Sequence, residues 1–272
     1  MFRREFILRI GVFDSGLGGL SVLREIRREM PAASLHYVAD SAWVPYGPRG
    51  DEFIQRRSLA LAGFLVEHGA DVVVVACNTA TAAAVPLLRQ SLDLPIVGME
   101  PAVKPATAAS RNGKVGVLAT VGTLQSARFA ALLDQFSSNI EVLTRACPGL
   151  VEQVEAAALD TPRTRALVEQ YTAPLLRAGV DTLVLGCTHF VFLRPLIEAV
   201  VGPEVTVIDT GAAVARQVRL VAGCLEATGD RAGGVEFWTS GDAERLAAPL
   251  NALWGGRVAL NSLPGEYVGQ SA

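Results

Sequence analysis

Two cysteines stand at matching points of a weak internal repeat, and their thiols are the first candidates for chemistry. The repeat pairs GADVVVVACNT, residues 69–79, with GVDTLVLGCTH, residues 179–189, so Cys187 follows Cys77 by 110 residues. Each cysteine comes directly after a short apolar run, where a helix is expected to begin, and a helix N-terminus stabilises a thiolate. The alternative is that both are small buried hydrophobes. Their duplication favours a reactive pair that removes a proton from one face of a substrate and returns one to the other.

The other cysteines and the histidines offer no metal site. The four cysteines show no paired metal-ligand spacing, and a reducing compartment would keep them as thiols. Cys147 and Cys224 lack the strand-and-helix context and are interpreted as structural. The histidines, His36, His68 and His189, are too dispersed for a histidine metal cluster. No metal is therefore expected.

A glycine-rich turn near the N-terminus presents Asp14 and Ser15 in GVFDSGLGGLSV, between an expected strand and an expected helix. Side-chain capping is its plain interpretation, and a dinucleotide-binding turn with Asp40 as the later acidic residue is a second one. Against that second interpretation, Ser21 replaces the third glycine, and Asp14 would place a negative charge beside a pyrophosphate. An amine is the better neighbour for Asp14.

Two further polar groups fall in the loops at the same strand ends. Tyr46 and Gly47 belong to a Pro-Tyr-Gly turn after the second expected strand, where loops carry binding groups as well as ordinary turns. His189 lies two positions after Cys187 and is suited to adjust the protonation of its thiol.

The lysines argue against a pyridoxal cofactor, which needs a Schiff-base lysine. The chain has only Lys104 and Lys114, and neither falls in a strand-end loop. A mechanism without a cofactor is favoured.

The elements that would position these residues alternate as in a parallel α/β fold. Apolar runs such as DVVVVA, KVGVLA and DTLVLG read as strands covered on both faces. The repeat predicts two pseudosymmetric three-layer lobes: a first formed by residues 1–98 plus 210–272 and a second formed by residues 99–209. Ligands bind beyond the carboxyl ends of such strands, so the predicted active site lies in the cleft between the lobes.

Composition points to a small-molecule partner. The chain has 272 residues, half of them apolar, with 6% aromatics and a net charge of −3, so it lacks the basic surface of a nucleic-acid binder. The start MFRREFILRI has no signal-peptide core, and no apolar run approaches the roughly 20 residues of a membrane span. We expect a cytoplasmic protein that contacts neither nucleic acid nor membrane.

Six motifs in order, GVFDSGLGG, PYG, CNTA, GMEPA, GCTH and FWTSGD, resemble those of glutamate racemases over nearly the whole chain. CNTA and GCTH also occur across the wider aspartate/glutamate racemase superfamily. The resemblance implies a cofactor-independent isomerase that interconverts L- and D-glutamate, with Cys77 and Cys187 as the two bases at Cα. It further implies a role in supplying D-glutamate for peptidoglycan, and homodimers are common among its members.

The same resemblance assigns the neighbouring groups. Asp14, His189 and Glu155 would poise the thiols, although Glu152 is a second candidate for the carboxylate. The residues that would hold the substrate are Asp14, Ser15, Tyr46, Gly47, Asn78, Thr79, Thr188 and His189, with Thr120 and Thr123 near its side-chain carboxylate. Phe190-Val191 and Thr210 depart from the usual pattern. An aspartate or hydantoin racemase, and a binding module without turnover, are the alternative functions.

Overall fold

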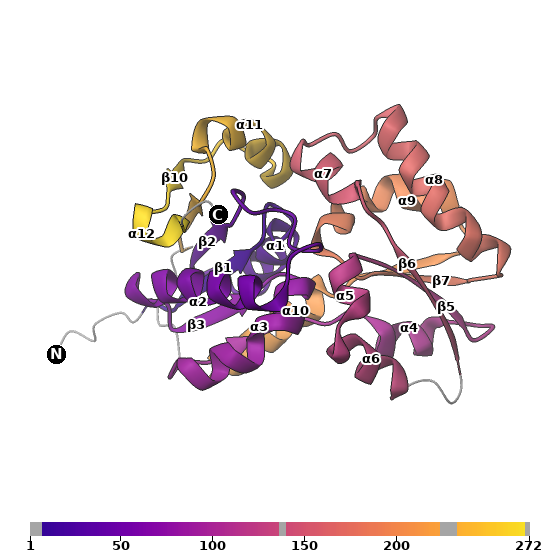
Figure 1. Cartoon of the computed structure of the whole chain (residues 1–272), viewed down its shortest axis with the longest axis horizontal. Helices are drawn as coiled ribbons and strands as arrows, with labels where there is room; N and C mark the ends of the chain where they lie inside the picture. Colours follow the sequence, from indigo (N-terminus) through magenta and orange to yellow (C-terminus); the bar gives the residue numbers. More distant parts are fainter. Residues whose placement is uncertain (1–6, 136–139, 224–232, 270–272) are drawn as a thin grey trace.

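The computed structural model describes residues 7–135, 140–223 and 233–269. These residues form two sheets, each made of parallel strands, with helices around them (Figure 1). Cys224 lies outside the described residues. The architecture confirms the predicted α/β fold with mainly parallel sheets.

The first sheet has six strands in the order β10-β9-β2-β1-β3-β4, and the paired strands run parallel. Its members are β1 (Arg9–Asp14), β2 (Ser34–Ala39), β3 (Val72–Val75), β4 (Ile96–Val97), β9 (Val235–Thr239) and β10 (Leu260–Ser262). The last two strands return from the C-terminal part of the chain to extend this sheet beside β2.

The second sheet has four parallel strands in the order β6-β5-β7-β8. They are β5 (Lys114–Ala119), β6 (Glu141–Ala146), β7 (Thr182–Leu185) and β8 (Thr206–Ile208). Strands β1 and β5 occupy equivalent places, each between two neighbours, as the internal repeat predicts. We propose residues 1–98 plus 210–272 and residues 99–209 as the limits of the two lobes.

Helices connect and cover the strands. In chain order they are α1 (Leu20–Glu29), α2 (Asp51–Glu67), α3 (Asn78–Ser91), α4 (Val103–Ala109), α5 (Val121–Gln125), α6 (Ala127–Asp134), α7 (Leu150–Glu155), α8 (Pro162–Arg177), the 3₁₀ helix η1 (Thr188–Leu193), α9 (Arg194–Val201), α10 (Gly211–Ala222), α11 (Ala243–Trp254) and α12 (Gly265–Val268). Among the described residues, none of the helices has the length and apolar character needed to cross a membrane.

The two cysteine-bearing turns differ in one respect that the repeat does not predict. Cys77 caps a 14-residue α-helix, whereas Cys187 is followed by the six-residue 3₁₀ helix η1. Pro195 is at the start of α9, but a proline alone does not account for the break, because α3 continues through Pro86. The second thiol therefore cannot rely on a long helix dipole.

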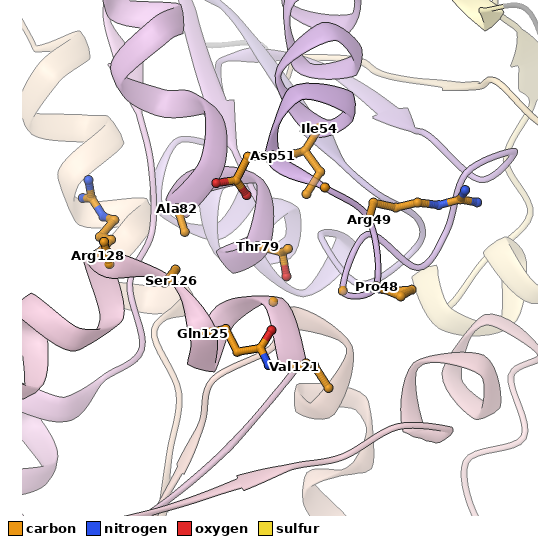
Figure 2. Close-up of a pocket in the computed structure, with 14 residues that line it drawn as sticks. Pro48, Arg49, Asp51, Ile54, Thr79, Ala82, Val121, Gln125, Ser126 and Arg128 are labelled. Atoms are coloured by element: carbon orange, nitrogen blue, oxygen red, sulfur yellow. The ribbon is translucent and has the colours of Figure 1, made fainter. Parts of the chain in front are cut away.

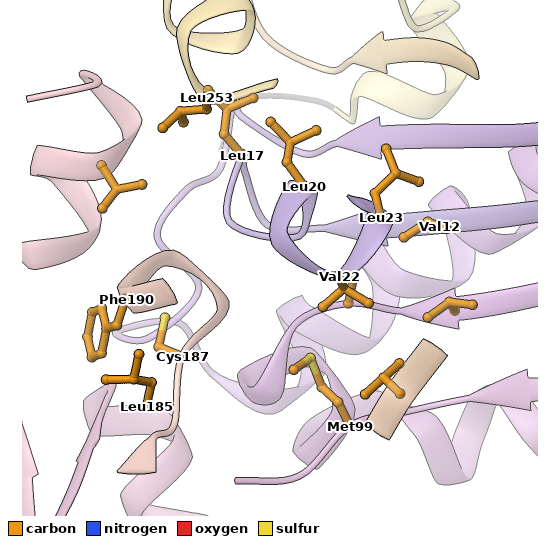
Figure 3. Close-up of a cluster of buried hydrophobic side chains, with 14 of the residues drawn as sticks. Val12, Leu17, Leu20, Val22, Leu23, Met99, Leu185, Cys187, Phe190 and Leu253 are labelled. Atoms are coloured by element: carbon orange, nitrogen blue, oxygen red, sulfur yellow. The ribbon is translucent and has the colours of Figure 1, made fainter. Parts of the chain in front are cut away.

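A hydrophobic cluster runs through both lobes (Figure 3). It joins Leu17 and Leu20 from the first lobe to Leu185, Cys187 and Phe190 from the second, and each of these side chains is almost fully buried. The lobes are thus packed together through a shared core beside the predicted site.

Candidate functional site

Cys77 lies at the end of β3 and is the N-cap residue of α3. Its backbone is extended, and its sulfur accepts a hydrogen bond from the Ala80 amide, with 3.4 Å between N and Sγ. The thiol points toward Ser15 Oγ at 3.9 Å. The side chain is only 5% exposed, so it is shielded from bulk water.

Burial and a nearby carboxylate favour the neutral form of Cys77. Burial, and next the negative charge of Asp14, raise the pKa of the thiol well above its usual value. Asp14 is itself fully buried, and its two oxygens accept hydrogen bonds from the Ser15 and Gly19 amides, each at 2.7 Å. Burial raises the pKa of Asp14, against the opposing effect of the His189 charge and of the hydrogen bond from the Gly19 amide. Cys77 is therefore a proton donor in this arrangement.

Cys187 meets a different set of partners. Its sulfur lies 3.7 Å from Nδ1 of His189, whose Nε2 is 2.6 Å from Oε1 of Glu155. Burial disfavours the charged imidazole, but the contacts with Cys187 and Glu155 outweigh it and raise the pKa of His189 well above its usual value. An imidazolium in this position places a positive charge and an N–H donor beside the sulfur of Cys187.

Glu155 also joins the two lobes. Its Oε1 accepts a hydrogen bond from the Leu17 amide in the turn after β1, at 2.6 Å. Glu152, the other candidate from the sequence, lines a neighbouring and mainly apolar pocket with Pro148. The structure therefore places Glu155, and not Glu152, against His189.

One small cavity brings most of the predicted residues together. It has about 10 Å³ of free volume and is lined by Ser15, Pro45, Tyr46, Gly47, Cys77, Asn78, Thr79, Thr120, Thr123, Val151, Cys187, Thr188 and His189. That volume suits about one water molecule. A substrate of amino-acid size requires the lobes or the lining side chains to move apart.

The cavity is lined by one side-chain amide without a hydrogen bond and by a cluster of three threonine hydroxyls. Both amide atoms of Asn78 are buried without a hydrogen bond, although buried polar atoms are nearly always paired. The Thr79 hydroxyl lies 2.9 Å from that of Thr120 and 3.2 Å from that of Thr123. These groups can bind the polar ends of a small substrate.

The Pro-Tyr-Gly turn lines the cavity in a way that the sequence does not reveal. The Tyr46 hydroxyl donates to the buried Asp40, so it is not free to bind a ligand. The turn lines the cavity with Pro45, Gly47 and the part of Tyr46 other than its bound hydroxyl. Asp40, the later acidic residue of the dinucleotide interpretation, forms an ion pair with Arg57.

Several site contributors escape motif reasoning. Pro45 and Val151 line the cavity, and only their positions next to Tyr46 and Glu152 hint at it. Gly18 allows the turn after β1 to lie against the second lobe, since a Cβ there would be 2.3 Å from His189 Nδ1. The glycine-rich turn is therefore a close contact between the lobes.

An open depression of about 470 Å³ adjoins this cavity (Figure 2). Gly47 and Thr79 line both spaces. Figure 2 shows Asp51 and Ile54 at the start of α2 on one side and Val121 and Gln125 of α5 on the other. The depression is a natural route between solvent and the cavity.

The sequence is similar to those of known racemases over most of the chain. The sequence profile of the Asp/Glu/Hydantoin racemase family matches residues 10–218. A glutamate racemase from Pseudomonas aeruginosa PAO1 is 56% identical over 257 residues, which cover 93% of this chain and 97% of that protein. A glutamate racemase from Stutzerimonas stutzeri is 53% identical over 258 residues, covering 94% of this chain and 97% of that protein.

The chain belongs to the Asp/Glu/hydantoin racemase family.

Solved structures agree with this membership. A glutamate racemase isoform from Bacillus anthracis superimposes with a TM-score of 0.86 at 32% identity, covering 97% of this chain and 99% of that one. An Escherichia coli glutamate racemase in complex with L-glutamate and the activator UDP-MurNAc-Ala gives a TM-score of 0.84 at 33% identity, covering 95% and 98%. The predicted resemblance and enzyme class are confirmed: this family member is an amino-acid racemase, an isomerase.

Proposed function

We propose that this racemase interconverts L- and D-glutamate by proton transfer between Cα and two thiols, without a cofactor. The observation that carries the proposal is that Cys77 and Cys187 line one cavity from different sheets, with unlike protonation partners. The protein's relatives that are named glutamate racemases, including one solved with L-glutamate, support the choice of substrate.

The proposed reaction begins with Cys187 as a thiolate and Cys77 as a thiol. The Cα–H bond breaks as its proton passes to the sulfur of Cys187, and Cys77 then delivers its proton to the opposite face of Cα. The products are the other enantiomer, a neutral Cys187 and a Cys77 thiolate. Before the next cycle, Cys187 gives up the proton that it took from Cα and Cys77 takes one up, by exchange through water, in the direction that the raised pKa of Cys77 favours. The reverse reaction exchanges the two roles.

Preorganised polar groups would stabilise the carbanion and orient the substrate. We propose that the unpaired Asn78 side-chain amide and the Thr188 hydroxyl bind the polar groups of the substrate near its Cα, because both residues line the cavity beside a cysteine. We assign the hydroxyls of Thr79, Thr120 and Thr123 to the side-chain carboxylate. The proposed binding set also includes Ser15, Tyr46 and Gly47. Asp14 and Glu155 do not line the cavity, and we propose that they adjust the protonation of the thiols.

D-Glutamate is the product that peptidoglycan synthesis requires, and we propose this as the physiological role. A cytoplasmic location follows from the same proposal and suits free thiols in a reducing compartment. A homodimer, common among glutamate racemases, remains a prediction that sedimentation of the purified protein would test.

The central test is incubation of the purified protein with L-glutamate in D₂O, following optical rotation and the α-proton NMR signal. We expect rotation to fall to zero as the α-proton is replaced by deuterium. A binding module would leave both signals unchanged. Faster turnover of aspartate or a hydantoin in a parallel substrate panel would overturn the assignment of glutamate.

Cysteine variants test the two-thiol step. Cys77→Ala and Cys187→Ala should each lower racemisation by at least about 10³-fold while retaining the fold, because each removes a proton carrier that no neighbour replaces. Cys147→Ala is the matched control: the Cys147 thiol donates to the Arg145 carbonyl, and it lies outside the cavity. Full turnover by either Cys77→Ala or Cys187→Ala would refute the mechanism.

A further inference from the structure

A buried ion pair lies directly beneath the Pro-Tyr-Gly turn. Asp40 is fully buried after the end of β2, and Arg57 of α2 is only 6% exposed. The guanidinium binds both carboxylate oxygens, with Nε 2.9 Å from Oδ2 and Nη2 2.7 Å from Oδ1. The Tyr46 hydroxyl donates to the same Oδ2. One carboxylate therefore ties helix α2 to the turn.

The C-terminal segment reinforces this tie. Arg57 Nη2 also donates to the Tyr267 carbonyl at 2.8 Å, and the Trp43 indole N–H donates to the Val268 carbonyl at 2.9 Å. Both carbonyls belong to α12, which follows the last strand of the first sheet. The stretch from Trp43 to Tyr46 is thus held by the helix below it and by the C-terminal segment beside it.

Stability alone is a poor reason for such a pair. Removing two charges from water is costly, and well-packed apolar side chains of similar size often replace a buried ion pair without loss of stability. A bidentate pair does, however, restrict orientation more strongly than apolar contact. The fixed geometry of this pair is suited to accurate placement of the turn that it holds.

The turn that it holds meets the second lobe with little clearance. A Cβ on Gly47 would lie 3.2 Å from Thr120, and a Cβ on Gly122 would lie 2.8 Å from the Gly47 carbonyl. Gly47 borders both the inner cavity and the outer depression. A small displacement of the turn would therefore change the cavity wall between Tyr46 and Thr120.

We infer that Asp40 and Arg57 are positioning residues for this racemase, which act through the Tyr46 hydroxyl to set the substrate-binding turn. The inference rests on the proposed function, in which Tyr46 and Gly47 contact the substrate. The ion pair does not touch the reacting atoms, and the hydrogen-bond partners of the two sulfurs are other residues: Ser15 and Ala80 for Cys77, and His189 for Cys187. Loss of the tie should therefore weaken substrate binding much more than it slows the chemical step.

Tyr46→Phe is the cleanest variant, because it removes only the hydroxyl and leaves the Asp40–Arg57 pair in place. Arg57→Lys keeps the charge but cannot bind both carboxylate oxygens in the same plane. We expect each to raise KM for glutamate by about tenfold or more, since misplaced binding groups are costly, with kcat changed by less than about threefold. The pH profile of kcat should not move.

Leu61→Ala is the matched control in the same helix. Leu61 is fully buried in the first lobe and forms part of the hydrophobic cluster around α2, so its truncation destabilises the lobe without removing a bond of the network. Its KM should equal that of the wild type. If Leu61→Ala raises KM as much as Tyr46→Phe, the effect is general loosening and the inference is wrong.

A binding measurement separates this inference from the proposed mechanism. Calorimetric titration of L-glutamate into Cys77→Ala, with and without Tyr46→Phe, should show the same tenfold loss of affinity in the absence of turnover. An unchanged Kd and KM, together with inactive cysteine variants, would overturn the positioning role alone. Turnover by Cys77→Ala would instead overturn the two-thiol mechanism.

Discussion

The sulfurs of Cys77 and Cys187 occupy equivalent points of the repeat but meet opposite electrostatic environments. Cys77 faces the buried carboxylate of Asp14, and Cys187 faces His189, which Glu155 holds from its other nitrogen. A carboxylate disfavours a neighbouring thiolate and an imidazolium favours one. In the proposed mechanism, this asymmetry makes Cys187 the acceptor and Cys77 the donor for one direction, and the reverse direction starts with these roles exchanged.

His189→Gln tests this asymmetry at the residue scale. Because the raised pKa of His189 keeps the imidazole charged, its removal takes a positive charge from beside the sulfur of Cys187, which is the proposed base. We expect kcat/KM to fall by about 10²-fold and the acid limb of its pH profile to move to higher pH. The two enantiomers have equal free energies, so kcat/KM must fall equally for L- and D-glutamate.

The measurement is circular dichroism of glutamate from pH 5 to pH 10. Cys147→Ala, which keeps the imidazole, should retain the wild-type profile. An unshifted acid limb in His189→Gln would show that the imidazole has no electrostatic role at this thiol.

The turn between β1 and α1 packs so closely against the second lobe that it has no room for a side chain at Gly18. A Cβ at Gly18 would lie 2.3 Å from His189 Nδ1 and 2.6 Å from the Thr188 hydroxyl, so Gly18→Ala must displace the turn or the imidazole. We expect kcat/KM to drop by at least about 10²-fold, as misplacement by about 1 Å can cost that much. Racemisation assays and far-ultraviolet circular dichroism would separate lost activity from lost fold.

A second glycine supplies the matched control for that change. Gly63 lies inside α2, and a Cβ there would meet nothing within 4 Å. Gly63→Ala should raise the free energy of unfolding by about 0.5–1 kcal/mol, because alanine loses less conformational entropy in a helix, and should leave activity unchanged. Urea titration gives the first quantity, and a loss of activity equal to that of Gly18→Ala would contradict the local argument.

At the scale of the whole molecule, the shared core predicts that the lobes unfold together. The cluster of Figure 3 connects Leu17 with Phe190, and the Leu17 amide also binds Glu155 across the junction. The three tryptophans, Trp43, Trp238 and Trp254, all lie in the proposed first lobe, although Trp254 also packs against the shared cluster. Their fluorescence therefore reports mainly on the first lobe. Far-ultraviolet circular dichroism reports on helices of both lobes.

Urea unfolding followed by the two signals should therefore give coincident transitions. A loss of helical signal at lower urea, before any change in fluorescence, would show that the second lobe unfolds independently and that the common core contributes little to cooperativity.

Local patterns were sufficient for much of this molecule. Apolar runs identified parallel strands such as β3 and β7, because a strand buried on both faces needs continuous apolar residues. The repeat identified Cys77 and Cys187 as equivalent, and motif resemblance identified the family. The position of Asn78 and Thr79 at the start of a helix also follows from residues close to them in the chain.

Only the tertiary structure decided which distant groups meet. It selected Glu155 over Glu152, turned the Tyr46 hydroxyl toward Asp40, and brought Arg57 and the C-terminal α12 to the same turn. It also made the second cysteine turn a 3₁₀ helix. The physical reason is that periodicity reports the burial of a face, whereas protonation depends on charges and hydrogen bonds between side chains far apart in sequence. For Cys77 and Cys187, the internal repeat identifies them as a pair, and the packing of distant residues gives each sulfur its own hydrogen-bond partners.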